Sequence, residues 1–159
     1  VFLGTGKGDF AQAKKIKVGR FPHYRAYGDW NDDGHLDAAV TVSGEESVEI
    51  LLGDGKGGLK PFQRYMSGLN PHGLTTADFN GDRKLDLAVS NRTSADLSIF
   101  FGKGNGTFTD IYDFHTGHDG ITVSSGDFNE DGYIDLALIS ASSNSLIIFK
   151  GDGEGNFFE

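Results

Sequence analysis

The chain has 159 residues, of which 37% are hydrophobic and 23% charged, so one compact domain of ordinary size is expected. Its net charge of −9, with no cluster of Lys or Arg, argues against nucleic acid and an anionic membrane surface as partners. Cysteine is absent, which excludes disulfides and thiolate chemistry, and no run of 18 apolar residues is present to insert into a membrane.

The opening Val1-Phe2-Leu3 has neither an initiator Met nor a basic stretch. We therefore expect no signal peptide in this chain, and a numbering that begins inside a larger precursor or in a shortened chain. The 24 glycines are far above ordinary usage, but the segments between them are rich in Val, Ile, Leu and Phe. Glycine therefore punctuates ordered structure here, and a turn-dense β fold is expected.

Two motifs recur along the chain with the same period of 49 residues. A glycine hairpin reads GTGKGDF, GDGKGGL, GKGNGTF and GDGEGNF, and an Asp motif reads DWNDDGHLD, DFNGDRKLD and DFNEDGYID. The hairpins occupy residues 4–10, 53–59, 102–108 and 151–157, and the Asp motifs occupy residues 29–37, 78–86 and 127–135. Two motifs with one period and no insertions predict three structural repeats within a single segment, 1–159.

The middle repeat predicts four short strands separated by turn residues. The strands are expected at Gly73 to Phe79, Leu85 to Ser90, Leu97 to Phe101 and Thr107 to about Phe114. Gly and β-branched residues interrupt every window long enough for a helix. A period of 49 matches propeller blades, which repeat every ~40–50 residues. We therefore predict an all-β fold, a β-propeller built of four-stranded antiparallel blades.

The Asp motif follows D-x-[ND]-x-D-G-x-x-D and places oxygen donors at positions 1, 3, 5 and 9, with a backbone carbonyl at position 7. Ca²⁺ takes about six to eight oxygen ligands, and a tight loop between two strands can direct alternate side chains to one centre. We predict about one Ca²⁺ per repeat, three per chain. The predicted side-chain ligands are Asp29, Asn31, Asp33 and Asp37, then Asp78, Asn80, Asp82 and Asp86, then Asp127, Asn129, Asp131 and Asp135; the predicted carbonyl ligands belong to His35, Lys84 and Tyr133.

The second loop departs from the pattern at one position. Arg83 stands where Gly34 and Gly132 stand in the other loops. That position takes a backbone conformation costly for residues other than glycine, and Arg83 also adds a cation, although Gly81 offers compensating freedom. A metal is still predicted in this loop, with lower affinity than in the other two.

Two other interpretations of the Asp motif are less consistent with the sequence. An EF-hand shares its opening but requires a bidentate Glu at position 12, where Val40, Val89 and Leu138 stand. A metal-free turn rich in Asp and Asn usually explains a single cluster of this kind. Threefold recurrence with the same donor spacing favours a cation site instead.

The stretch DFNGDRKLDLAVSN, followed by LSIFFGKGNGTF, resembles the FG-GAP/VCBS repeat family of calcium-loop propellers, which includes integrin α-subunit heads. The resemblance spans nearly the whole chain. It implies a propeller of six to eight blades, with a Ca²⁺ loop joining the first two strands of each blade and the ligand positions named above. Family members include adhesion receptors, fungal lectins and domains of secreted enzymes, so we expect an extracellular or cell-surface location and leave the ligand open.

Two histidines precede their Asp motifs at equivalent places, His23 in FPHY and His72 in NPHG. They are either ligand contacts at the mouth of a propeller channel or ordinary turn residues. Trp30, Phe79 and Phe128 follow the first Asp of each motif, and strand alternation predicts that they pack in the core against the neighbouring blade. No G-x-S-x-G sequence is present and no Ser-rich stretch adjoins a histidine, so no catalytic residue is predicted.

Three blades do not close a ring, because propellers need about four to eight blades and an open arc exposes apolar faces and strand edges. The missing blades come from a second copy, giving a six-bladed homodimer, or from a longer parent of which this chain is a fragment or an engineered half. A strand from Phe10 to Val18 would complete, in a second chain, the blade left unfinished at Phe157-Phe158-Glu159. We therefore expect a homo-oligomer formed by strand exchange.

The leading functional hypothesis is a calcium-binding, non-enzymatic propeller that binds a carbohydrate or protein ligand or serves as a scaffold. A propeller domain of a polysaccharide-active enzyme is one alternative, and a fragment without a ligand of its own is another. No residue in the sequence identifies the ligand.

Overall fold

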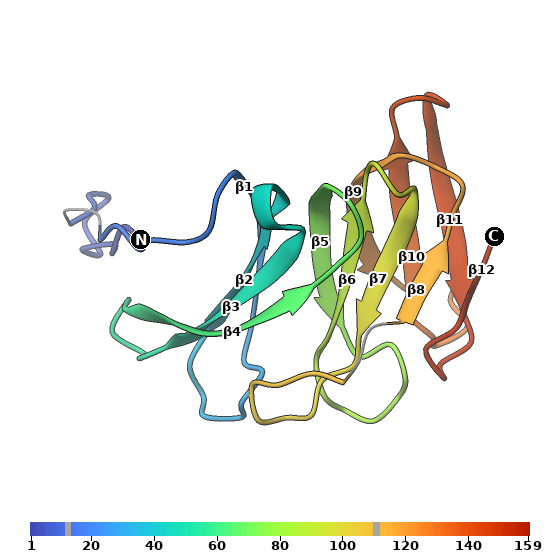
Figure 1. Cartoon of the computed structure of the whole chain (residues 1–159). Helices are drawn as coiled ribbons and strands as arrows, with labels where there is room; N and C mark the ends of the chain where they lie inside the picture. The colour runs from blue at the N-terminus through green and yellow to red at the C-terminus, as the bar shows by residue number, and fades with distance from the viewer. Residues whose placement is uncertain (12–13, 110–111) are drawn as a thin grey trace.

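The computed structural model describes residues 1–11, 14–109 and 112–159 and contains three antiparallel sheets of four strands each. The sheets are β1 (Pro22–Gly28), β2 (Asp37–Val42), β3 (Ser47–Gly53) and β4 (Leu59–Met66); β5 (Pro71–Ala77), β6 (Asp86–Asn91), β7 (Asp96–Phe100) and β8 (Tyr112–His115); and β9 (Gly120–Gly126), β10 (Asp135–Ser140), β11 (Ser145–Gly151) and β12 (Phe157–Phe158). They stand in a row, with the chain ends at opposite ends of it (Figure 1).

Each sheet follows chain order, so every strand pairs with the next one along the sequence. This is the arrangement predicted for a propeller blade, and the period of 49 residues carries one sheet onto the next. The 3-10 turn η1 (Ser43–Glu45) is the one helical element in the described ranges. Within those same ranges no helix has the length and apolar character needed to cross a membrane.

The strands predicted for the middle repeat are present with shifted boundaries. The first ends at Ala77 rather than Phe79, because Asp78 opens a loop whose backbone amides its carboxylate accepts. The fourth begins at Tyr112 rather than Thr107, and residues 110–111 lie outside the described part.

Two apolar layers lie between the sheets and form the core. The first joins the sheets of repeats one and two, and the second joins those of repeats two and three. Their most deeply buried members are at most 2% exposed and correspond after a shift of 49 positions: Trp30 to Phe79, Val48 to Leu97, Ile50 to Ile99, Leu87 to Leu136 and Phe100 to Phe149. The chain therefore builds the same interface between blades twice.

The prediction that Trp30, Phe79 and Phe128 are all core residues is confirmed for the first two and wrong for the third. Trp30 and Phe79 are each 2% exposed, whereas Phe128 is 51% exposed. Phe128 lies in the loop between β9 and β10 of the third sheet, which stands at the end of the row (Figure 1), and no further sheet in the described part of the chain covers it. Closure of the row into a ring stays a prediction.

Residues 1–21 precede the first sheet, and their described part contains no strand. The first glycine hairpin closes through a bridge between Gly4 and Phe10, and the amide of Ala11 donates to the carbonyl of Leu3 at 2.8 Å. Of the strand expected from Phe10 to Val18, residues 12–13 lie outside the described part and the others are not in a strand. Strand exchange concerns a second copy, so it also stays a prediction.

Candidate functional site

Each Asp motif forms the loop between the first two strands of its sheet. The loops join β1 to β2, β5 to β6 and β9 to β10, as the resemblance implied. All three lie at the lower edge of the row in Figure 1. The repeated donor sets therefore share one edge of the molecule.

The Asp at position 9 of each loop anchors the site, and all three of these residues are fully buried. Its carboxylate accepts two backbone N–H groups, one from the loop and one from the first glycine of the hairpin that follows β3, β7 or β11. The pairs of donors are Trp30 (3.1 Å) and Gly53 (2.8 Å) for Asp37, Phe79 (2.8 Å) and Gly102 (2.7 Å) for Asp86, and Phe128 (3.0 Å) and Gly151 (2.9 Å) for Asp135. The sequence analysis did not predict that the hairpin amides bond to position 9. The constant spacing between the Asp motif and the glycine hairpin could have indicated this contact.

The carboxylates of one loop lie close enough to affect one another. Burial raises the pKa of Asp37, and the negative charges of Asp33 and Asp29 raise it further, against the lowering effect of its amide bonds. In the second loop, burial raises the pKa of Asp86 to about 6, with the charges of Asp82 and Asp78 adding to the effect. These two loops thus concentrate negative charge around a buried carboxyl group.

The carboxylates at positions 1 and 5 of each loop accept backbone amides of the same loop. In the first loop, Asp29 accepts the amides of Asp33 (3.1 Å) and Gly34 (2.7 Å), and Asp33 accepts the amide of His35 (2.9 Å). The third loop repeats these bonds 98 positions later, which is two periods along the chain. The side-chain amide of Asn31 donates to Asp33 at 2.9 Å. These bonds hold positions 1, 3 and 5 in one tight turn.

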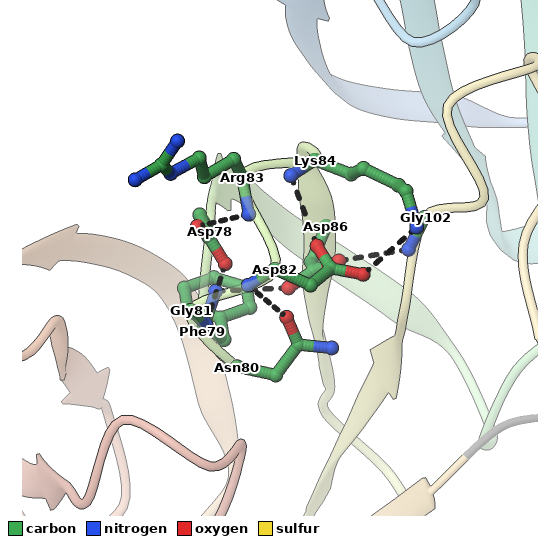
Figure 2. Close-up of polar contacts among 9 residues, drawn as sticks. All are labelled: Asp78, Phe79, Asn80, Gly81, Asp82, Arg83, Lys84, Asp86 and Gly102. Carbon is green, nitrogen blue, oxygen red and sulfur yellow. Dashed lines mark hydrogen bonds and ion pairs between the residues drawn. The ribbon is translucent and has the colours of Figure 1, made fainter.

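The second loop is also closed by bonds from backbone amides to its first Asp (Figure 2). Asp78 accepts the amides of Gly81 (2.8 Å) and Arg83 (2.7 Å), and Lys84 forms an ion pair with Asp82 at 3.2 Å. Arg83 has φ of 66°, in the left-handed region occupied by its counterparts Gly34 and Gly132. Arg83 therefore has the backbone conformation expected at this position, and its effect on metal affinity stays a prediction. Figure 2 shows its guanidinium extended away from Asp86.

The side chains at position 7 pack on the following hairpin. A methyl group on Gly55 would meet the ring of His35, and one on Gly153 would meet the ring of Tyr133. This packing occupies the side chains at position 7, and the role of their backbone carbonyls as cation ligands stays a prediction.

The donor set suits a hard cation in its chemistry, because every side-chain ligand is an oxygen. Across residues 1–11, 14–109 and 112–159, however, no three His, Cys, Asp or Glu side chains are already arranged as a metal site. The oxygens are directed at backbone amides instead. A carboxylate has about four lone-pair sites, so accepting two amides leaves capacity for a cation.

The two histidines predicted at equivalent places come together. The rings of His23 and His72 stack with centroids 4.4 Å apart, and Nδ1 of His72 hydrogen-bonds the carbonyl of Ile121 at 2.8 Å. Burial and the neighbouring His72 lower the pKa of His23. Ile121 is the third member of this series, so the histidines join the first strands of successive sheets.

Comparisons with known proteins agree with the repeat. A family model described as an FG-GAP-like repeat matches residues 29–89 and 78–138, which together cover more than half of the chain. No curated protein sequence matches it. A solved structure of a lectin from Agrocybe aegerita, which specifically recognises non-reducing terminal N-acetylglucosamine, has a similar fold, with a TM-score of 0.62 and 20% sequence identity. That match covers 99% of this chain and 44% of the lectin chain.

Proposed function

Because the chain belongs to the FG-GAP-like repeat family, we propose that it is a calcium-binding, non-enzymatic propeller module that presents a ligand-binding surface outside the cell. Carbohydrate is the first ligand class to test, since the lectin of similar fold recognises terminal N-acetylglucosamine. Protein is the second class, and the scaffold role needs no ligand.

The buried carboxylate at position 9 is the observation that carries the calcium proposal. Asp37, Asp86 and Asp135 are each fully buried. The ion pairs among the described residues join Arg64 to Glu45 and Glu49 and Lys84 to Asp82, and His118 lies 4.0 Å from Glu159. None of these cations reaches position 9. A buried carboxylate without a cation is costly, and a bound divalent ion would offset both the burial and the repulsion within the loop.

Positions 1, 3, 5 and 9 would hold the ion through side-chain oxygens, and position 7 through its carbonyl. The ion would supply charge compensation, and the protein's own groups would orient the donors. Since position 9 also accepts the hairpin amide, calcium would link the loop to the hairpin of the same blade. This role is structural, and it positions the edge of the propeller for a ligand.

Self-assembly is the other part of the proposal. The first and third sheets each have an outer face that carries exposed apolar side chains, including Leu36 (69% exposed) and Leu146 (65% exposed). A homodimer related by a twofold axis would cover both faces and give a ring of six blades.

Isothermal titration with Ca²⁺ tests the metal, and about three ions per chain are expected, with the second loop the weakest. A glycan array read with Ca²⁺ and with chelator tests the ligand class, and a screen on acidic polysaccharides tests for catalysis. A titration in which Ca²⁺ produces no heat of binding would contradict the metal proposal. Turnover of a polysaccharide would contradict the non-enzymatic assignment.

A further inference from the structure

We propose that the N-terminal segment, defined as residues 1–11 and 14–18, is an intramolecular stand-in for a neighbouring blade. It lies on the open face of the first sheet and must leave that face before the third sheet of a second copy docks there. This inference rests on the self-assembly proposed above and adds to it a competition within the chain.

The internal interfaces define what a neighbouring blade contributes. At the first interface, Leu52 at the end of the third strand packs on the next glycine hairpin, where a methyl group on Gly106 would contact it. At the second interface, Phe101 makes the same contact with Gly155. Both glycines have positive φ, so the hairpin presents bare backbone to the neighbouring side chain. One blade thus places an apolar residue on the hairpin of the next.

The N-terminal segment makes this contact on the first sheet. A methyl group on Gly57 would meet Leu3, and Leu3 lies 49 positions before Leu52. Close by, Nζ of Lys14 donates to the carbonyl of Lys56 at 3.3 Å. Leu3 therefore takes the place on the first hairpin that Leu52 takes on the second.

A second position repeats in the same way. The ring of Tyr65 meets that of Phe108 edge to face at 5.5 Å across the first internal interface. Ile16, 49 positions before Tyr65, lines a hollow with Leu59, which lies 49 positions before Phe108. One contact of the N-terminal segment and one hollow that it lines thus match positions where a complete blade makes contact.

The N-terminal segment covers the face only in part. Tyr27 and Leu36 remain 56% and 69% exposed, and both line a hollow of about 770 Å³ with Phe2. At the internal interfaces the counterparts of Leu36 pack into the core as partly buried residues. The stand-in therefore leaves apolar surface that a complete blade would bury.

The third sheet carries the other half of this interface. Phe128 is 51% exposed, whereas its counterpart Trp30 is 2% exposed; Leu146 is 65% exposed, whereas its counterpart Val48 is 1% exposed. The two open faces are thus complementary halves of an interface that the chain already builds twice. This continuity identifies the occupant as the third sheet of a second copy.

The open faces differ from the internal interfaces by two cations. Arg25 stands where Leu74 stands in the second repeat, and Lys150 stands where Leu52 and Phe101 stand. Desolvating these charges weakens the intermolecular contact relative to the internal ones. A weak interface makes competition by the N-terminal segment measurable.

The test is sedimentation velocity over a concentration series of the full chain in Ca²⁺. Leu3→Asp should expel the N-terminal segment and strengthen dimerisation about tenfold, whereas Phe128→Asp should abolish it. Arg25→Leu restores the apolar residue of the internal interfaces and should also strengthen it. Leu69→Asp, on the linker between β4 and β5, controls for a charge on an exposed leucine, and melting curves check that each variant folds.

The outcomes separate the inference from the proposal beneath it. If wild type dimerises, Phe128→Asp is monomeric and Leu3→Asp is unchanged or weaker, the stand-in is overturned while self-assembly holds. If every variant stays monomeric at all concentrations, the second copy is overturned as the occupant. A monomeric wild type with a dimeric Leu3→Asp variant would support the stand-in directly.

Discussion

Trp30 of the first repeat meets Phe108 of the second edge to face, with ring centroids 6.3 Å apart. Phe79 and Phe157 repeat the contact at 5.6 Å. Each pair joins the start of one Asp loop to the end of the next glycine hairpin, and the amide of Gly106 also donates to the carbonyl of Trp30 at 2.7 Å. The candidate metal loops are thus part of the contact between blades.

Trp30→Ala should lower the free energy of unfolding by about 3–5 kcal/mol, because it leaves a cavity between two sheets. Phe128→Ala is the matched control, since the equivalent ring is 51% exposed and its loss should change stability by only about 0.5 kcal/mol. Urea unfolding at low protein concentration, where self-association is negligible, measures both. Equal losses would contradict the assignment of the third sheet as the open end.

Chelation should lower the melting temperature by several degrees, because a ligand at about 100 times its dissociation constant stabilises the folded state by ~2.7 kcal/mol. Asp37→Asn should remove part of this calcium-dependent gain, since it replaces the buried ligand of the first loop. Asp9→Asn controls for the lost charge, because the hydrogen bonds to Asp9 within the described residues go to its backbone carbonyl and not to its carboxylate. If Ca²⁺ raises the melting temperature of Asp37→Asn as much as that of the wild type, the first loop is not a calcium site.

Arg83→Gly should tighten calcium binding at the second loop several-fold. The change relieves the left-handed backbone of Arg83, which costs about 1–2 kcal/mol, and removes a nearby cation. Arg83→Ala removes the charge but keeps the backbone cost, so titration of both variants separates the two effects. If Arg83→Gly and the wild type bind Ca²⁺ at the second loop with the same affinity, Arg83 does not weaken that site.

The contacts of Asp119, which lies outside the metal loops, predict that the stability of the fold depends on pH. Its carboxylate accepts the hydroxyl of Ser142 (2.5 Å), the amide of Ser142 (3.0 Å) and the hydroxyl of Ser140 (2.8 Å), and these bonds lower its pKa to about 2. An unfolded Asp titrates near ~3.9, so this stabilisation is complete above that pH and is lost as the pH falls toward 2.

Asp119→Asn should therefore destabilise the protein at neutral pH and have little effect at pH near 2. Thermal melts from neutral to acid pH, with Asp9→Asn as the control for surface charge, measure the difference. A destabilisation of the same size at every pH would show that the bonds do not depend on the ionised carboxylate.

Local patterns predicted the elements of this fold well. The period of 49 residues located every sheet, and turn residues separated the strands to within a few positions in β5–β8. The boundary at Ala77 was missed because Asp78 bonds the amides of its own loop, a choice that strand alternation does not encode. The histidines were found at equivalent places, but their stacking depends on how the first strands of successive sheets approach each other.

The repeat, the donor set of each loop and the departure at Arg83 were determined by the sequence alone, because a period and a ligand spacing are properties of the chain. Only the tertiary structure decided that position 9 is bonded to the following hairpin, that Phe128 is exposed while Trp30 is buried, and that Leu3 lies on the first hairpin. Identical motifs differ in burial here because burial depends on which sheet lies next to them, and no sheet in the described part of the chain lies on the outer face of the third sheet.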